Sequence, residues 1–204
     1  MTKATQTHDH KRLAEAFAYT AKLHRGQERK GTGVPYISHL MAVASLVQEH
    51  GGTEDQVIAA LLHDGPEDHG GKKTLRKIRR RFGKDVGKIV KECSDTLKRK
   101  KEEWRARKER YLAHLPEASP EALLVSLSDK VHNLRCIVRD YRADGEDLWE
   151  RFNGGREVLW YYAALLDAYK AAGAAVNPVL LDEYRRTLEE LWELDRKAAQ
   201  VTST

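Results

Sequence analysis

A histidine and three carboxylates lie within the six residues His63–Asp68, which read His-Asp-Gly-Pro-Glu-Asp. This segment directly follows the apolar run Val57–Leu62, and a helix that is apolar on all sides is normally buried. Buried charges are costly unless they are paired or bind a metal. The proline is expected to stop the helix just after the His-Asp pair, because it disfavours a helical conformation in the residue before it. We therefore predict half of a metal site at the mouth of a pocket, with an acid/base pair beside it.

Two more candidate ligands come from other predicted helices. His39 shares a helix face with the apolar residues four and seven positions after it. Taken alone, this pattern is more typical of a core histidine with satisfied hydrogen bonds than of a metal ligand. Asp129 lies off the apolar stripe of its own helix and shares a face with Asn133, four residues on. Taken alone, Asp129 could equally be a surface carboxylate.

These residues together provide two imidazoles and two carboxylates: His39, His63, Asp64 and Asp129. Such a ligand set suits Mn²⁺, Fe²⁺, Zn²⁺ or Mg²⁺, and its oxygen content favours Mn²⁺ or Mg²⁺ over a closed zinc site. A bound ion of this kind can lower the pKa of its water toward about 7 and polarise a phosphorus centre. The two cysteines, Cys93 and Cys136, match no metal or redox spacing and are expected to be reduced residues in or near the core.

Helices must position these residues, because every periodic segment of the sequence has helical spacing and none alternates like a strand. We expect Thr53 to begin the apolar helix with a capping box, Thr74 to cap the basic helix after it, and Ser119 to cap a long helix. The fold class is therefore predicted to be all-α. The expected helices run approximately over residues 13–24, 36–50, 53–63, 75–82, 85–93, 98–111, 120–138, 158–172 and 178–194.

The composition indicates a globular protein with a highly charged surface. Of the 204 residues, 41% are hydrophobic and 33% are charged, and this length suits one domain. No apolar run approaches the ~20 residues of a membrane span. The first ten residues lack the apolar segment of a secretory signal, which predicts a cytoplasmic protein. We expect one domain over residues 8–200, with a motif core at 17–140, C-terminal helices at 155–198 packed on it, and loose termini at 1–7 and 201–204.

The positive charge is unevenly distributed. The formal net charge is +5, basic residues crowd the segment 72–101, and the segment 182–195 is rich in acids. Such a basic stretch could attract nucleic acid or a small polyanion such as a nucleotide, and charge alone does not separate the two. A basic loop over 24–36 carries Arg29 and Lys30, and its three glycines and one proline exclude regular structure. That loop is either a binding loop or a solvated turn.

The pattern of candidate ligands resembles that of a known family. His39, His63-Asp64 and Asp129 match the H…HD…D signature of the HD phosphohydrolase superfamily. The similarity extends over residues 17–135 with its motifs in order, which makes it specific, and it implies an HD-domain helical bundle. Three blocks resemble the RelA/SpoT hydrolase domain in particular: HxGQxRK…PYIxH at 24–39, ALLHDxxED at 60–68 and DKxxNLR at 129–135.

The resemblance also implies an activity. Hydrolases of this family use Mn²⁺ to remove pyrophosphate from the 3′ position of (p)ppGpp, which gives GDP or GTP. The resemblance places one Mn²⁺ ion on the four ligands above, with other divalent metals left open. It implies that Glu67 and Asp68 position and deprotonate the attacking water, which suits two carboxylates whose pKa values separate near a cation. Arg29, Lys30 and Asn133 would contact the nucleotide, and the arginine could stack on the base.

The sequence departs from the family pattern after the helix that follows the HD block. Ser94–Leu97 stands where the family usually has Thr-Asp-Asp-Lys, and four cations follow at 98–101. We expect Lys98 and Lys100 to contact the pyrophosphate, although a solvated basic helix is the alternative. These departures leave the purine base open, so adenosine alarmones such as (p)ppApp could be accepted.

Two other functions fit parts of the sequence. A phosphatase that acts on another ribose phosphate, such as the 2′-phosphate of NADPH, would use the same metal site. A non-catalytic HD protein that binds nucleic acid is favoured only by the basic stretches. A degenerate site would usually have lost a ligand, Glu67 or Asp68, and all are present. The expected partner is therefore a small nucleotide rather than nucleic acid or a membrane, and self-association stays open.

Overall fold

The computed structural model describes residues 10–97 and 103–201, and the predicted substrate contacts Lys98 and Lys100 lie outside them. Within the described residues the backbone forms helices and no strand, which confirms the all-α prediction. None of these described helices combines the length and the apolar character needed to cross a membrane. In chain order the helices are α1 (His10–Leu23), α2 (Ile37–Glu49), α3 (Glu54–Leu62), α4 (Gly65–Asp68), α5 (Lys72–Phe82), α6 (Lys84–Cys93), α7 (Trp104–His114), η1 (Leu115–Glu117), α8 (Pro120–Asp144), η2 (Gly145–Arg151), α9 (Glu157–Ala171), η3 (Gly173–Ala175) and α10 (Pro178–Val201).

Two of the predicted helix starts are confirmed. Thr53 accepts a hydrogen bond from the Gln56 N–H, and the Gln56 side chain accepts one from the Thr53 N–H at 2.7 Å, which completes the capping box of α3. The Ser119 hydroxyl accepts a hydrogen bond from the Ala122 N–H at the start of α8. Both side chains therefore satisfy N–H groups that have no partner inside the helix.

The predicted cap of α5 is wrong. α5 begins at Lys72, two residues before Thr74, because the chain enters the helix from a turn at Gly71 with φ 55°. That conformation favours glycine, and a Cβ at this position would lie only 2.6 Å from the carbonyl oxygen of Leu97. Thr74 is buried inside the first turn of α5, where its hydroxyl donates to the carbonyl of His69.

The segment after α3 also differs from the prediction. α3 ends at Leu62, but Gly65 and Pro66 open a second short helix, α4, instead of a loop. Proline is tolerated in a first helical turn because the N–H group that it lacks would have no partner there. The chain therefore turns at His63-Asp64, between two helices, and the two carboxylates that follow lie on a helical turn.

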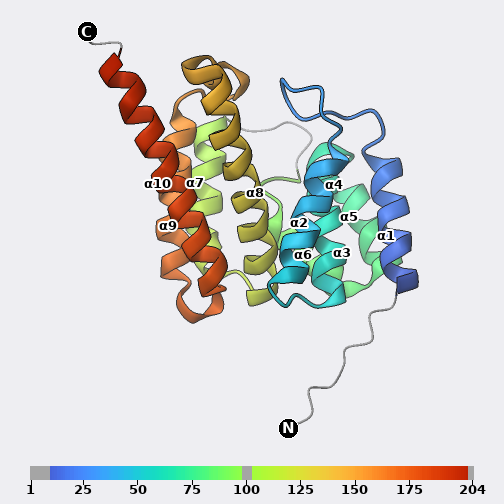
Figure 1. Cartoon of the computed structure of the whole chain (residues 1–204). Coiled ribbons are helices and arrows are strands. Elements are labelled where there is room, and N and C mark those ends of the chain that lie inside the picture. The colour runs from blue at the N-terminus through green and yellow to red at the C-terminus, as the bar shows by residue number, and fades with distance from the viewer. Residues whose placement is uncertain (1–9, 98–102, 202–204) are drawn as a thin grey trace.

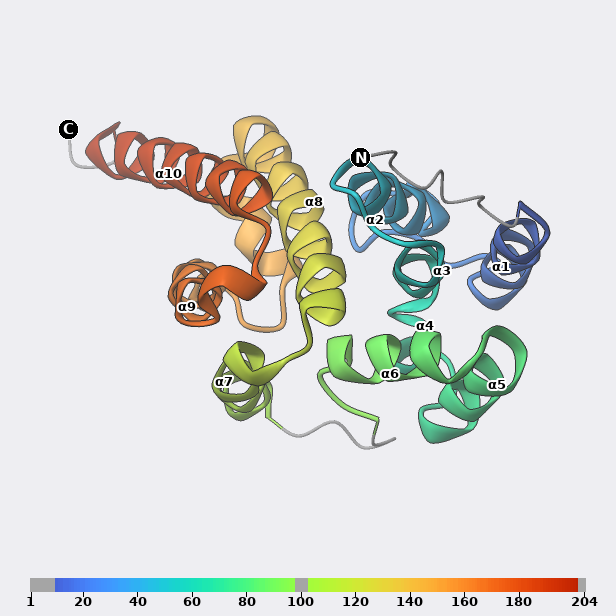
Figure 2. The ribbon, with the colours of Figure 1, turned by 90° about the horizontal axis from the view of Figure 1, so that it is seen from below.

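α8 lies between two buried apolar clusters (Figures 1 and 2). The first cluster is formed mainly by α1, α2, α3, α5 and α6, and α8 adds Ala122 and Val125 to it. The second is formed mainly by α8, η2, α9 and α10, with Leu134 and Tyr184 fully buried. Figure 2 shows α9 and α10 on one side of α8 and α2 and α3 on the other. A site between the two clusters therefore takes side chains from both.

Truncating Leu127 tests this packing. Leu127 is fully buried in the second cluster, so Leu127→Ala is expected to lower the free energy of unfolding by ~2–5 kcal/mol through lost burial and the cavity left behind. Leu124→Ala on the same helix is the control, because Leu124 is only partly buried and its loss should be smaller. Urea unfolding monitored by circular dichroism measures both. Equal losses would contradict the arrangement of α8.

Candidate metal centre and adjoining pocket

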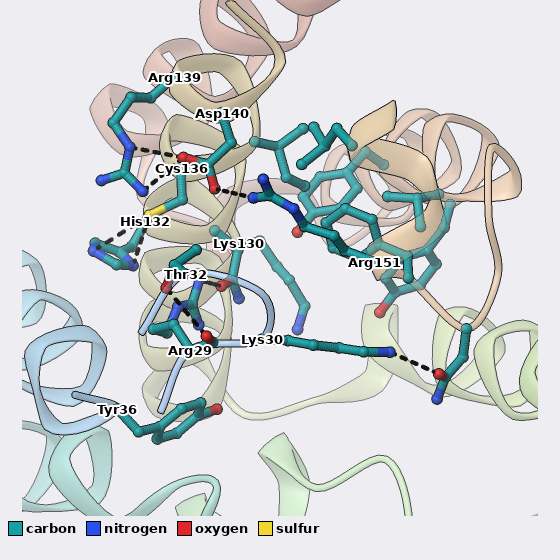
Figure 3. Close-up of a pocket in the computed structure, with 18 of the residues that line it drawn as sticks. Arg29, Lys30, Thr32, Tyr36, Lys130, His132, Cys136, Arg139, Asp140 and Arg151 are labelled. Atoms are coloured by element: carbon teal, nitrogen blue, oxygen red, sulfur yellow. Dashed lines mark hydrogen bonds and ion pairs between the residues drawn. The ribbon is translucent and has the colours of Figure 1, made fainter. Parts of the chain in front are cut away.

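A cavity of about 650 Å³ opens beside α8 (Figure 3). It lies between the N-terminal half of the protein, which contains α1 to α6, and the C-terminal half, which contains α7 to α10. This volume lies in the range of about 300–1,000 Å³ that is usual for sites of small organic ligands. Glu67, Asp95 and Asp140 are the acidic residues among the described residues that line it. Because cations outnumber these acids, the cavity suits a ligand with several negative charges. The lining cations are Arg29, Lys30, Arg107, Lys108, Lys130, Arg139 and Arg151.

The loop over 24–36 forms one wall of this cavity and carries two of the predicted substrate contacts. Arg29 Nη2 donates to Asn133 Oδ1 at 2.8 Å, and the Arg29 guanidinium lies 5.8 Å from the centre of the Tyr36 ring. Lys30 Nζ donates to Asn153 Oδ1 at 3.0 Å on the opposite side of the cavity. The structure therefore brings Arg29, Lys30 and Asn133 to one cavity, as the sequence predicts.

Gly31 explains how the loop can approach the C-terminal half so closely. Its φ is 75°, and a Cβ there would lie 2.8 Å from Cδ of Arg151. Arg151 is itself held by Asp140 at 3.6 Å and by Asp144. A side chain at position 31 would therefore force Arg151 or the loop to shift, and it would also be strained at this φ.

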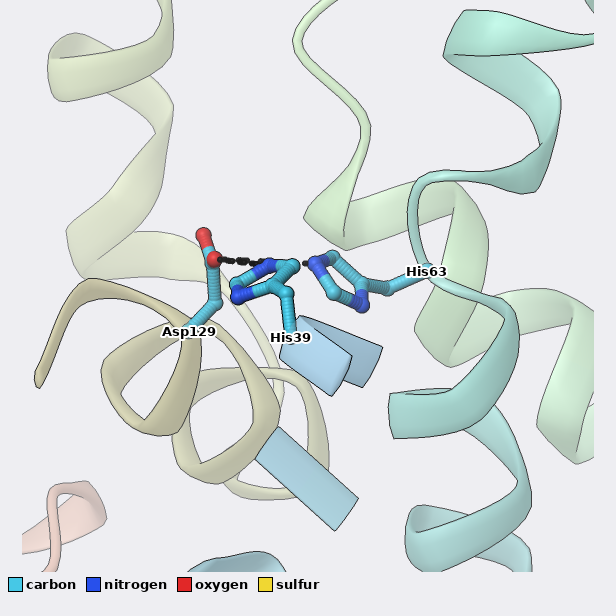
Figure 4. Close-up of side chains that lie close together, drawn as sticks. All are labelled: His39, His63 and Asp129. Carbon is cyan, nitrogen blue, oxygen red and sulfur yellow. Dashed lines mark ion pairs between the residues drawn. The ribbon is translucent and has the colours of Figure 1, made fainter. Parts of the chain in front are cut away.

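A smaller cavity of about 190 Å³ adjoins the first, and its walls include His63, Asp64 and Asp129. His39 from α2, His63 at the end of α3 and Asp129 from α8 point toward one another (Figure 4). Their candidate ligand atoms all lie within 4.8 Å of each other. Asp64 Oδ2 completes the group at 3.1 Å from His63 Nε2 and 3.6 Å from His39 Nε2. The four residues predicted as ligands are thus together.

His63 lies deeper than predicted. It is 4% exposed, whereas we expected it at the mouth of a pocket, and His39, whose pattern is typical of a core histidine, is fully buried. The difference arises because α8, which carries Asp129, packs against both α2 and α3 and covers this part of the site. Asp64 is the most exposed of the four, with 23% of its side-chain surface accessible. Access to the centre is therefore from the side of Asp64 and the larger cavity.

Hydrogen bonds fix how the two imidazoles present their nitrogens. His63 Nδ1 lies 2.8 Å from the Ala60 carbonyl, to which it donates, and His39 Nδ1 lies 2.8 Å from His132 Nδ1. Burial lowers the pKa of His132 to about 4, so its neutral ring can accept a hydrogen bond from the Nδ1–H of His39. The Nε2 atoms of His39 and His63 are buried and form no hydrogen bond with the described residues. Two buried Nε2 atoms without a partner, facing carboxylates, fit a divalent cation.

The carboxylates are held in their ionised form. Burial would raise the pKa of Asp129, but the Lys130 ammonium together with His39 and His63 outweighs burial and holds this pKa well below its usual range. Burial likewise works to raise the pKa of Asp64, but His63 and His39 together outweigh it and hold this pKa well below its usual range. Burial works to lower the pKa of His63, but Asp64 and Asp129 raise it well above its usual value. A cation bound at Nε2 would therefore compete with a proton.

A second layer of side chains orients these carboxylates. Asp129 Oδ1 accepts a hydrogen bond from Asn133 Nδ2 at 2.5 Å, and Asp129 Oδ2 accepts one from Lys130 Nζ at 2.6 Å. The Tyr36 hydroxyl donates to Asp64 Oδ2 at 2.6 Å. Lys130 was not singled out from the sequence, because neighbouring residues of a helix do not normally face each other.

The two carboxylates of α4 point to different surroundings. Glu67 lines both cavities, and its Oε1 accepts a hydrogen bond from the Asp95 backbone N–H. Burial, with the charges of Asp64 and Asp95, raises the pKa of Glu67 to about 7. Asp68 is exposed, and its Oδ2 accepts a hydrogen bond from Gln27 Nε2 at 2.8 Å. Among the described residues, Glu67 therefore lies at the candidate site and Asp68 lies at its outer edge.

Three residues of the cavity wall were missed by the sequence analysis. Arg107 Nη1 and Lys108 Nζ both form ion pairs with Asp95 Oδ2, at 2.7 and 2.8 Å. The side chains of Asp95 and Arg107 are nearly inaccessible to solvent. Burial lowers the pKa of Lys108, against the effect of Asp95. Both cations belong to the helix predicted over 98–111, so the basic pattern of that helix was the available signal. α7 presents them to the cavity, not to solvent.

Loss of one imidazole tests the metal centre. Mn²⁺ at about 100 times its Kd is expected to stabilise the folded protein by ~2.7 kcal/mol, which raises Tm by about 5–10 °C for a chain of this length. His63→Ala should abolish the shift, because it removes a buried Nε2 ligand. His114→Ala, at an exposed histidine of α7, is the matched control and should keep it. Thermal unfolding with and without EDTA measures the shift, and an equal shift in both variants would exclude this site.

Comparison with known proteins identifies relatives over most of the chain. The family model for the HD domain matches residues 16–160. Guanosine-3′,5′-bis(diphosphate) 3′-pyrophosphohydrolase MESH1 of Homo sapiens is 40% identical over 130 residues, which cover 62% of this chain and 70% of that protein. The Xenopus tropicalis protein of the same name is 39% identical over the same shares. The bifunctional (p)ppGpp synthase/hydrolase SpoT of Escherichia coli is 35% identical over 76% of this chain and 21% of that protein.

Solved structures show the same fold. A structure described as a metazoan ortholog of SpoT that hydrolyzes ppGpp superimposes with a TM-score of 0.70 and 24% identity, over 93% of this chain and 98% of that one. The protein lmo0812 from Listeria monocytogenes superimposes with a TM-score of 0.64 and 26% identity, over 76% of this chain and 99% of that one. The first match covers the C-terminal helices as well as the matched family region.

Proposed function

The chain belongs to the HD-domain family, and from this premise we propose that it is a metal-dependent hydrolase of alarmones of the (p)ppGpp type. Its reaction removes the 3′-pyrophosphate, as the names of its relatives state for guanosine-3′,5′-bis(diphosphate), and would leave GDP or GTP. One observation carries the proposal: two buried imidazole Nε2 atoms without a hydrogen-bond partner face two carboxylates, next to a cavity lined by seven cations. A hydrolase for a nucleotide with several phosphates needs both features.

The four residues His39, His63, Asp64 and Asp129 would hold the metal, which we propose to be one Mn²⁺ ion. When bound, the ion supplies Lewis-acid polarisation of the scissile phosphate and of water. Their mixture of nitrogen and oxygen ligands supports Mn²⁺, although other divalent metals have overlapping preferences. The side chains of Asn133, Lys130 and Tyr36 keep the carboxylate oxygens in place whether or not an ion is present.

Glu67 is the residue that we propose to take the proton of the attacking water. Its pKa of about 7 lets the carboxylate accept a proton near neutral pH, and the Asp95 N–H holds one of its oxygens in place. We propose Asp68 as the second residue of the pair that positions the water, because the resemblance to the family implies that role. In this conformation its carboxylate is bonded to Gln27, which supports a role in holding the loop over 24–36.

The larger cavity accommodates the nucleotide. Arg29, which lies over Tyr36, could stack on the purine base, and Lys30 and Lys108 are placed to meet phosphates. The cavity draws its walls from the loop over 24–36 and from α7, α8, η2 and α9. The site therefore needs both halves of the protein, which supports one functional domain over residues 8–200, of which 8 and 9 lie outside the described part.

The activity itself is tested with a panel of nucleotides. We expect pyrophosphate release from ppGpp or ppApp in Mn²⁺, and its loss in EDTA, because the metal would supply the polarisation of the scissile phosphate and of water. Anion-exchange chromatography resolves the products, and the faster of the two substrates identifies the purine. NADPH is the third arm: if orthophosphate from NADPH is the sole product in the panel, the protein is a phosphatase of another ribose phosphate. No release from any of the three would exclude a hydrolase of this kind.

The role of Glu67 is tested by its pH dependence. Only the ionised carboxylate can accept a proton, so kcat is expected to rise as the pH increases through the Glu67 pKa, which a bound cation would hold at or below about 7. Glu67→Gln should lower kcat by roughly 10²–10⁴-fold and remove this rising limb, while Mn²⁺ still raises Tm. Asp68→Asn is the matched control, and we expect it to keep the limb because the exposed Asp68 is not the proton acceptor. A fully active Glu67→Gln variant would refute the assignment.

A further inference from the structure

α5 carries far more positive charge than the rest of the chain. Seven of its 11 residues are cations and none is acidic. Residues 72–93, which cover α5 and α6, have a net charge of +8, so the remaining residues together sum to −3 against a total of +5. The positive character of the protein therefore comes from this one segment.

The cations of α5 gather on a single face of the helix. Thr74, Ile78 and Phe82 are buried and point into the N-terminal half. At about 100° per residue, the cations occupy the remaining half of the helix circumference, and all of them are exposed. Figure 2 places α5 at the edge of the molecule away from α9 and α10. We call this surface the α5 basic face; its members are Lys72, Lys73, Arg76, Lys77, Arg79 and Arg80.

The charge of the α5 basic face is not used to stabilise the fold. Arg81, at its border, pairs with Glu15 and lies over the Tyr19 ring, but the six members form no ion pair with any part of the chain that the structure describes. Like charges repeat four residues apart, as in Lys73 and Lys77, and such pairs destabilise a helix. Two lysines also lie in the first turn, where the helix dipole favours acids. This arrangement favours an external polyanion.

We propose that the α5 basic face binds the phosphate backbone of a nucleic-acid duplex, independently of base sequence. A helix fits the major groove of a B-form duplex, and cations spread over half of its circumference could meet the phosphates on both sides of that groove. The exposed side of α5 presents lysine and arginine but no asparagine, glutamine, serine or threonine, so its positive charge, which attracts phosphates of any sequence, is the feature that would bind a duplex. None of the six cations lines the two cavities of the candidate site or a third cavity at α6 and α7, so a small nucleotide is not the ligand of this face.

An anionic membrane is the weaker partner for this face. Helices that lie on membranes bury an apolar face of leucine or aromatic side chains in the lipid. In α5 the corresponding residues, Leu75, Ile78 and Phe82, are buried or half-buried against the protein itself. The exposed surface of α5 therefore offers charge without apolar side chains, which matches a phosphate backbone better than a bilayer.

The test compares two matched double variants of the full chain. Lys73→Gln/Lys77→Gln removes two charges from the α5 basic face, and Lys170→Gln/Lys197→Gln removes two exposed charges from α9 and α10. Fluorescence anisotropy with labelled 20-base-pair DNA and RNA duplexes is measured over a series of salt concentrations. Two lost phosphate contacts should reduce the salt slope of log K by about 2 and weaken binding roughly 10-fold or more at low salt. The control pair should bind like the unmodified protein.

Two further readouts separate the proposal from its competitors. Lys73→Arg/Lys77→Arg should restore binding, since it keeps both charges, and alarmone hydrolysis should be unchanged in every variant because the face lies outside the cavities. Binding of the DNA duplex with the expected loss supports the proposal, whereas binding of the RNA duplex alone would overturn it, because the major groove of an A-form duplex is too narrow for a helix. Equal losses in the two glutamine pairs, or binding to phosphatidylserine vesicles without binding to a duplex, would overturn it. The circular dichroism spectrum of each variant is the control for correct folding.

Discussion

The structure depends on holding imidazoles and carboxylates from three helices in one buried space. A buried carboxylate such as Asp129 is strongly destabilising unless its charge is compensated. The chain compensates it with Lys130 and Asn133, and compensates Asp64 with Tyr36 and His63. The apolar clusters on both sides of α8 help to bury His39, His63 and Asp129, and burial strengthens the polar contacts among these side chains. The two halves of the fold therefore act as walls around one polar layer, and α8 belongs to both.

α8 also shows what sequence periodicity can and cannot predict. Its stripe of Leu127, Val131 and Leu134 predicts a core face, and all three residues are buried. Asp129 lies off that stripe, and the pattern alone cannot separate a ligand from a surface acid. The structure shows why: α8 is covered on two sides, by α9 and α10 and by α2 and α3, so it lacks the single exposed face that the periodicity argument assumes. The resemblance of motifs, not the periodicity, identified Asp129.

Contacts between distant segments could not be predicted in the same way. Asp95, which follows α6, pairs with Arg107 and Lys108 of α7, and no spacing in the sequence encodes that approach. Adjacent carboxylates were expected to act together, but successive residues of a helical turn point about 100° apart. Once Gly65-Pro66 begins α4 instead of a loop, Glu67 faces the cavities and Asp68 faces Gln27. The local motifs therefore predicted which residues belong to the site better than they predicted where those side chains point.

The hydrogen bonds that run from Arg29 through Asn133 to Asp129 connect the nucleotide cavity to the metal centre. Arg29 donates to the amide oxygen of Asn133, and the amide nitrogen donates to the carboxylate. A ligand that draws the guanidinium away would change the partners of that amide and the charge presented to a cation. Binding of the two would then be coupled, and coupling free energy is reciprocal: if the nucleotide tightens the metal by some factor, the metal tightens the nucleotide by the same factor. Through this one asparagine, the concentrations of the cation and of the nucleotide would together set the fraction of the protein that has both ligands bound.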